Sequence, residues 1–97
     1  MRVITARRLQ QFWAGCPEAE GPLRKWLQLV EAADWRTLAD LKRMFPSADY
    51  VANGRVVFNM GGNKFRLVAI IEYEKHLVFV RFVGTHAAYD RLDVGTV

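Results

Sequence analysis

The main change in the spacing of hydrophobic residues along this chain of 97 residues lies near Tyr50. Before that point, apolar residues recur every three or four positions, which is the period of an amphipathic helix. Residues 1–4 predict a short strand, and two helices follow whose apolar positions are Leu9, Phe12 and Trp13 in the first and Leu23, Trp26, Leu27 and Val30 in the second. Gly15 and Pro17 separate the two helices, so we expect an antiparallel helical hairpin.

Polar residues mark where the helices of this half are expected to begin. Thr5 predicts an N-cap for the first helix, because its hydroxyl can accept a hydrogen bond from a free backbone N–H. Asp34 predicts the N-cap of a shorter third helix that buries Leu38 and Leu41. Pro46 ends that helix, since proline cannot continue the hydrogen-bond ladder.

Beyond Tyr50 the period is two, and β-branched and aromatic residues fill three runs, at 55–60, 64–73 and 77–83. Gly61-Gly62 predicts a tight turn between the first two runs, and Glu74-Lys75 joins the second to the third. These runs predict an antiparallel β-meander. Thr85 then predicts the N-cap of a last helix, residues 86 to about 92, followed by a disordered tail. The order of elements is typical of an α+β fold.

The register of the predicted meander decides which residues share a face. With two-residue loops at both turns, Met60 pairs with Asn63, and one face of the three strands is almost entirely apolar. The opposite face then carries Arg55, Asn59, Lys64, Arg66 and Arg81. In this register Arg66 and Arg81 are diagonal neighbours, with backbones roughly 7–8 Å apart. Two such guanidinium groups repel unless an anion lies between them, so the pair favours a phosphate site over a merely solvated sheet face.

Composition limits the classes of function. A chain of 97 residues builds one core, so we expect a single domain over residues 1–97. No apolar stretch approaches the roughly 18 residues that a membrane helix needs, and no secretory signal is visible, so we expect a cytoplasmic protein without a membrane partner. Cys16 is the only cysteine and there are two histidines, which argues against a disulfide framework and a metal cofactor. The formal net charge of +4 permits a polyanionic partner.

A histidine and a tyrosine are expected near the arginine pair. In a helix that begins after Thr85, His86, Tyr89 and Asp90 share one face. A neutral imidazole can accept a proton, Asp90 can fix its tautomer, and Tyr89 can exchange protons or stack on a base. The alternative is that His86 and Tyr89 only fill space and cover the sheet edge. We assign His76 no role, and the pairs Arg7-Arg8 and Arg24-Lys25 either contact RNA or an acidic partner or form solvated helix faces.

Residues 57–69, with the sequence VFNMGGNKFRLVA, carry a resemblance to a known family together with Arg81, Thr85-His86 and Tyr89-Asp90. With the upstream residues 45–50, this region resembles the HigB-type toxins of bacterial type II toxin-antitoxin modules, within the RelE-like group of small ribonucleases. The resemblance implies a RelE-like microbial ribonuclease fold. It also implies an endoribonuclease that cuts mRNA, typically on translating ribosomes, inhibits growth, and is neutralised by a HigA-type antitoxin with a helix-turn-helix DNA-binding domain.

The resemblance also implies site residues. Arg66 is similar to the central-strand arginine that holds the scissile phosphate, whereas Arg81, His86 and Tyr89 match the group in region and type. Related ribonucleases often end in a more closely spaced His-Tyr pair, but here Ala87 and Ala88 intervene. Which of His86 and Tyr89 is the base and which the acid therefore stays open.

The chemistry of RNA cleavage fits these residues. RNA carries its own nucleophile, the 2′-hydroxyl, so a site needs a base, cations for the developing charge and an acid, without a metal or other cofactor. The prediction assigns catalysis to Arg66, Arg81, His86 and Tyr89 and RNA binding to Arg55, Asn59 and Lys64. Two alternatives are a non-catalytic RNA- or ribosome-binding module that blocks translation and a docking face for an acidic protein. We expect no direct DNA binding except through the antitoxin complex.

Overall fold

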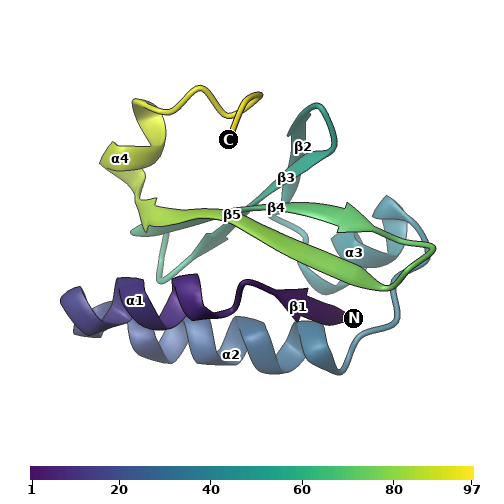
Figure 1. Cartoon of the computed structure of the whole chain (residues 1–97), viewed down its shortest axis with the longest axis horizontal. Coiled ribbons are helices and arrows are strands. Elements are labelled where there is room, and N and C mark those ends of the chain that lie inside the picture. Colours follow the sequence, from purple (N-terminus) through teal and green to yellow (C-terminus); the bar gives the residue numbers. More distant parts are fainter.

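The computed structural model describes all 97 residues, and they form an α+β fold around a five-stranded sheet. The strands are β1 (Arg2–Ile4), β2 (Asp49–Ala52), β3 (Arg55–Met60), β4 (Phe65–Glu72) and β5 (Leu77–Thr85). The helices are α1 (Arg7–Gly15), α2 (Glu20–Glu31), α3 (Leu38–Met44) and α4 (His86–Asp90). Helices α1 and α2 run along one side of the sheet, and α4 with the last residues lies on the other (Figure 1). The predicted class, helical hairpin, third helix and last helix are confirmed.

The predicted antiparallel meander is confirmed in β3, β4 and β5, and the added strand β1 makes the whole sheet mixed. Its strand order is β1-β5-β4-β3-β2, and β1 runs parallel to β5 at one edge. The other pairs are antiparallel. Strand β2 was not predicted. It has only four residues and lies at the sheet edge with Tyr50 exposed, so the run is too short for an alternation of apolar and polar residues to be recognised. None of the helices is long and apolar enough to cross a membrane.

The β3–β4 hairpin keeps the predicted faces but not the predicted register. Met60 pairs with Phe65, so the loop spans residues 61–64 and contains four residues in place of two. Gly61, Gly62 and Asn63 all have positive φ angles, of 62°, 63° and 71°, and this run of left-handed residues makes the wider turn. A shift of two residues leaves every side chain on its predicted face, because the side chains of a strand alternate with a period of two.

A β-bulge in β5 overturns the predicted Arg66–Arg81 pair. Ile71 pairs with Val78 as predicted, but the register shifts between Val68 and Ala69, so Arg66 lies opposite Gly84. Arg81 falls in the bulge and is three positions from Gly84, which is roughly 10 Å along the strand. The two arginines are therefore not diagonal neighbours.

Four aromatic residues form the centre of the core between the helices and the sheet. The ring of Phe58 lies 5.4 Å from that of Trp26, 5.2 Å from that of Phe45 and 6.4 Å from that of Trp35, measured between centroids. Trp26, Trp35 and Phe58 are all buried, with exposed fractions of 2% or less. These tryptophans thus serve packing, as their helical spacing indicates.

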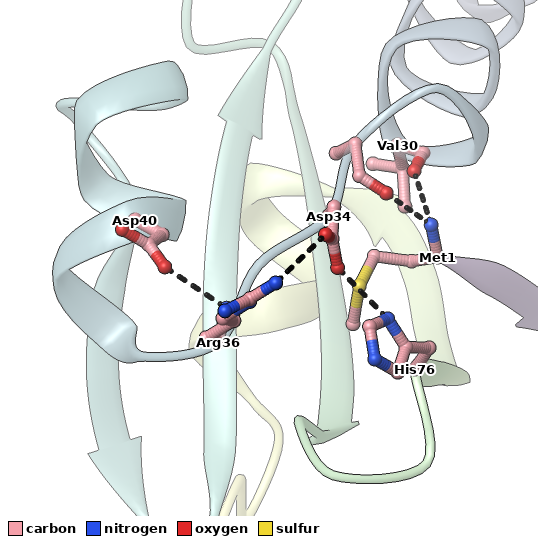
Figure 2. A network of polar contacts seen from close by, with 7 residues as sticks. Met1, Val30, Asp34, Arg36, Asp40 and His76 are labelled. Atoms are coloured by element: carbon pink, nitrogen blue, oxygen red, sulfur yellow. Dashed lines mark hydrogen bonds and ion pairs between the residues drawn. The ribbon is translucent and has the colours of Figure 1, made fainter.

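Two of the predicted helix caps are wrong. Thr37, not Asp34, caps α3, and its hydroxyl accepts a hydrogen bond from the Asp40 N–H. Asp34 instead lies in the polar network of Figure 2, where its carboxylate is 3.0 Å from Nδ1 of His76. Thr5 has a positive φ of 65° and lies one residue before the N-cap of α1, Ala6.

The same network ties the start of β1 to the end of α2. The Met1 nitrogen donates to the carbonyl oxygens of Val30, at 3.2 Å, and of Ala33 (Figure 2). These carbonyls belong to the last turn of α2 and the residues just after it, where helical carbonyls lack helical partners and favour a positive group.

The chain after α4 is ordered against the sheet, contrary to the predicted disordered tail. It returns across the face opposite the helical hairpin towards the β2–β3 turn (Figure 1). The Asn53 amide donates to the Gly95 carbonyl at 3.1 Å, and Arg55 donates to the Val97 oxygen at 2.6 and 3.2 Å. These bonds tie residues 95 and 97 to the strand that begins at Arg55.

Candidate functional site

The end of β5 brings an arginine and a histidine to one corner of the sheet. Arg66 on β4 lies directly opposite Gly84 on β5, and His86 begins α4 two residues later. The His86 N–H donates to the Lys64 carbonyl at 3.0 Å, which ties the start of α4 to the loop just before Arg66. The predicted convergence of Arg66 with the start of the last helix is thus present in the structure.

The first turn of α4 holds His86 in a defined position. Thr85 caps the helix as predicted, and its hydroxyl accepts a hydrogen bond from the Ala88 N–H at 3.1 Å. Nδ1 of His86 is 2.9 Å from a carboxylate oxygen of Asp90, one helical turn away. This contact orients the imidazole and leaves Nε2 without a partner in the chain, so that nitrogen is available for proton transfer. Tyr89 lies on the same helix and is half-buried.

The guanidinium of Arg66 is held over its own loop. Its Nη1 donates to the carbonyl oxygens of Asn63, at 3.0 Å, and Phe65, at 3.2 Å, and the side chain is half-buried. A guanidinium has five N–H donors in a fixed plane, so these two bonds leave the remaining donors for a phosphate. No carboxylate pairs with Arg66. Arg66 therefore carries an unpaired positive charge at the end of the sheet where α4 begins with His86.

Two of the predicted RNA-binding residues lie close to this corner but have partners within the chain. Asn59 pairs with Arg66 across the β3–β4 ladder, and its amide donates to the Ser47 carbonyl at 3.0 Å. The Nζ of Lys64 lies 3.5 Å from the Glu18 carboxylate, on the side of the helical hairpin. Both ends of that ion pair are well exposed, so it is a weak contact. Lys64 contributes to the corner through its carbonyl, which holds His86.

Arg55 and Arg81 lie away from the corner. Arg55 stands at the far end of β3, opposite Ile70, and its guanidinium donates to the Asn53 and Val97 oxygens. Arg81 is exposed in the bulge of β5, and its carbonyl accepts a hydrogen bond from Nη1 of Arg8 at 3.0 Å. The structure thus brings Arg66, Asn59 and the Lys64 carbonyl to the end of the sheet where α4 begins with His86, with Tyr89 further along that helix, and it separates Arg55 and Arg81 from them.

Phe82 is a site neighbour that the sequence prediction missed. A Cβ placed on Gly84 would lie 2.7 Å from Cζ of the Phe82 ring, so the ring lies over Gly84, directly across the ladder from Arg66. Phe82 is half-buried, and an aromatic ring beside a bound phosphate can stack on a base. The sequence Phe82-Val83-Gly84 could have indicated this contact, because a glycine inside a strand often marks a site where another group packs closely against the backbone.

The corner is an open surface. None of the three surface hollows of the molecule is lined by Arg66, His86 or Tyr89. No group of three or more His, Cys, Asp or Glu side chains is placed to hold a metal ion. A polar corner that lies outside any hollow suits a polymer that lies across it better than a small molecule that must be enclosed.

Comparison with known proteins matches this chain to one family. The family described as HigB_toxin, RelE-like toxic component of a toxin-antitoxin system, matches residues 19–92. The mRNA interferase toxin HigB of Escherichia coli K12 is 30% identical over 92 residues, which cover 93% of this chain and 88% of that protein. The mRNA interferase HigB of Shigella flexneri matches to the same extent. The mRNA interferase HigB of Escherichia coli O6:H1 is 26% identical over 94 residues, covering 95% and 91% of the two chains.

Proposed function

Because the chain belongs to the HigB family, the RelE-like toxic components of toxin-antitoxin systems, we propose that it is an mRNA interferase, an endoribonuclease that cuts messenger RNA and so inhibits translation and growth. The observation that carries the proposal is the corner where Arg66 and His86 meet. The Arg66–Gly84 pairing and the bond from the His86 N–H to the Lys64 carbonyl place a guanidinium and an imidazole at the same end of the sheet. These are the two kinds of group that RNA cleavage needs most.

The proposed mechanism uses the 2′-hydroxyl of the RNA as nucleophile. A base removes its proton, the O2′–P bond forms, and the P–O5′ bond breaks, which leaves a 2′,3′-cyclic phosphate and a 5′-hydroxyl. Arg66 stabilises the extra negative charge on the phosphorus oxygens at the transition state through paired N–H donors. No metal takes part in this scheme.

His86 and Tyr89 supply the proton transfers. Asp90 fixes Nδ1 of His86, so Nε2 is the nitrogen that exchanges a proton with the RNA. Tyr89, three residues further along the same helix, is either the second proton donor or acceptor or a surface on which a base stacks. Asn59, across the ladder from Arg66, and Lys64, whose ion pair with Glu18 is exposed and weak, then bind the RNA strand and not the reacting phosphate.

The family membership also supports two partners. A toxin-antitoxin module requires an antitoxin, and we propose a HigA-type helix-turn-helix protein in that role, through which alone the complex contacts DNA. We further propose that the enzyme acts in the cytoplasm on mRNA within translating ribosomes. The open corner supports this setting, since a strand that is already held by a ribosome need only be laid across an exposed surface.

The proposal is tested by expressing Arg66→Ala in cells and mapping mRNA ends by primer extension. Arg66 donates only to carbonyls of its own loop, so the variant should fold while losing growth arrest and new mRNA ends. Full growth arrest with a folded Arg66→Ala protein would rule out the assigned role. Growth arrest by the wild type with intact mRNA would favour the alternative, a non-catalytic module that blocks translation by binding.

A further inference from the structure

Two segments of the chain are rich in arginine and free of carboxylates. The first 17 residues and strand β5 contain no Asp or Glu, but they contain Arg2, Arg7, Arg8 and Arg81. The chain has 14 Lys and Arg residues and 10 Asp and Glu residues, so without these four arginines ten basic residues balance ten acidic ones. These two segments thus carry four arginines and no carboxylate, and they meet at the edge of the sheet where β1 pairs with β5 and α1 contacts the bulge.

Three of these arginines form a group, which we call the edge cluster: Arg7, Arg8 and Arg81. Nη1 of Arg8 donates to the Arg81 carbonyl at 3.0 Å, which brings the start of α1 against the bulge of β5. Arg7 and Arg8 line one shallow hollow together with Thr5, Ala6 and Gln11. All three arginine side chains of the cluster are exposed.

The edge cluster has no carboxylate partner. Five other basic residues, Arg24, Arg36, Lys42, Arg43 and Lys64, each pair with an Asp or Glu. No such pair includes a member of the edge cluster, and helix α1 has no acidic residue at all. Neighbouring guanidinium groups without a counter-charge raise the local potential, and they bind phosphate oxygens through paired donors.

The bulge explains why Arg81 belongs to this cluster and not to the catalytic corner. The extra residue in β5 separates Arg81 from Arg66 and places its backbone within reach of Arg8. Arg81 precedes His86 by five positions, roughly 16 Å along an extended strand. Strand β1 pairs only with Leu77–Phe79, so no neighbouring strand separates the cluster from the corner along the edge of β5.

We infer that the edge cluster binds the phosphate backbone of the single-stranded RNA that the corner cleaves, a few nucleotides away from the scissile bond. The inference rests on the proposed function and deepens it, because it assigns the path of the substrate along the edge of β5. Arg81 then contributes to RNA affinity and not to the chemical step, which departs from its predicted catalytic role. Phosphate contacts of this kind carry no base preference, so they position the strand while other contacts select the cleavage site.

The test measures binding of a fluorescein-labelled single-stranded oligoribonucleotide of about 12 nucleotides by anisotropy at several salt concentrations. Every protein carries His86→Ala so that the probe stays intact. The variant Arg8→Gln/Arg81→Gln removes two charges from the cluster and keeps polar side chains of similar length. The control, Lys25→Gln/Lys75→Gln, removes the same net charge from two exposed lysines that have no carboxylate partner.

We expect the cluster variant to raise Kd about tenfold and to lower the slope of log Kd against log salt by roughly 1.4, or 0.7 for each lost phosphate contact. The lysine control should stay within about twofold of the parent, because a change in net charge alone is screened beyond about 10 Å at ordinary ionic strength. Equal Kd values for the two double variants would overturn the inference.

A kinetic arm with intact His86 separates the inference from the proposed function. Arg8→Gln/Arg81→Gln should raise KM with kcat unchanged, whereas Arg66→Ala should lower kcat. If the wild type cuts no RNA but the binding difference is present, the proposed function fails and the phosphate site stands. A loss of kcat in Arg81→Gln would instead place Arg81 on the reacting phosphate. If Arg8→Gln/Arg81→Gln weakens binding only to ribosomes, the cluster binds ribosomal RNA. If the variant weakens binding only to the antitoxin, the cluster is a protein surface. Each of these outcomes contradicts the inference.

Discussion

The contact between His86 and Asp90 predicts a sharp difference between two substitutions in the same helix. If His86 transfers a proton, His86→Ala should lower kcat by about 10²–10⁴-fold, the usual contribution of a positioned acid or base. Asp90 acts only by orienting the ring. Its carboxylate and the imidazole are 58% and 50% exposed, so their contact at 2.9 Å is a surface interaction. Such i,i+4 pairs are worth about 0.3–0.5 kcal/mol, which corresponds to about a twofold change in the population of the oriented ring.

Asp90→Asn should therefore lower kcat by only about two- to threefold, and the amide oxygen can still accept from Nδ1. The double variant His86→Ala/Asp90→Asn should be no slower than His86→Ala alone, because Asp90 then has no ring to orient. Asp93→Asn is the control, since it removes one negative charge from the exposed chain after α4 and Asp93 pairs with no histidine.

The assay is cleavage of a defined mRNA by purified protein, with thermal unfolding to verify that each variant is folded. A loss in Asp90→Asn as large as that in His86→Ala would refute a purely orienting role. Full activity in His86→Ala would refute proton transfer by the histidine altogether.

Three further outcomes follow from the structure. Gly84→Ala places a methyl group 2.7 Å from the Phe82 ring. Because that ring is half exposed and can swing outwards, the free energy of unfolding in urea should fall by only about 1 kcal/mol. Adding Phe82→Leu to the Gly84→Ala variant should restore this stability. Thr85→Ala removes the cap of α4 and should cost about 1 kcal/mol, visible as faster hydrogen exchange at the Ala88 amide; unchanged exchange would contradict the cap. Burial raises the pKa of Tyr73 above its ordinary value of 10.0, so the unfolded chain loses that proton first and stability falls as pH rises above 10.0. Tyr73→Phe should remove this part of the alkaline loss of stability. An identical dependence of stability on pH in the variant and the wild type would contradict the role of Tyr73.

The faces of β3 and β4 were predictable from the sequence, although the pairing of these two strands was not. Met60 pairs with Phe65 and not with Asn63, but the shift of two residues preserves the alternation, so Arg66 stays on the predicted face. The loop length depends on the left-handed conformations of Gly61, Gly62 and Asn63, and a glycine pair is compatible with turns of several lengths.

The position of Arg81 could not be predicted, because a β-bulge leaves no mark on the hydrophobic period. Val78 and Val80 pack into the core before the bulge and Val83 packs against it afterwards, so both registers bury apolar residues. Contacts from outside the strand select the observed register. Thr5 donates to the Val80 carbonyl and Arg8 to the Arg81 carbonyl, and neither bond can be read from the pattern of β5 itself.

The His86 contact was predictable because it is local. Residues 86 and 90 are four apart, and Thr85 predicts the start of a helix. The sequence alone therefore predicts that the imidazole and the carboxylate lie together. The partners of Asn59 and Lys64 are distant in sequence, at Ser47 and Glu18, and depend on tertiary packing.

The chemistry of the cleaved ends tests the proposed reaction most directly. Purified wild-type protein should be incubated with translating ribosomes and a defined mRNA. A parallel reaction contains the protein with free mRNA in the presence of EDTA. The ends of the fragments from both reactions are identified by mass spectrometry. Attack by the 2′-hydroxyl predicts a 2′,3′-cyclic phosphate on one fragment and a 5′-hydroxyl on the other, both absent with Arg66→Ala and with His86→Ala. Fragments that carry a 3′-hydroxyl and a 5′-phosphate, or the same cyclic ends from both variants, would contradict the assignment of this corner as the catalytic site.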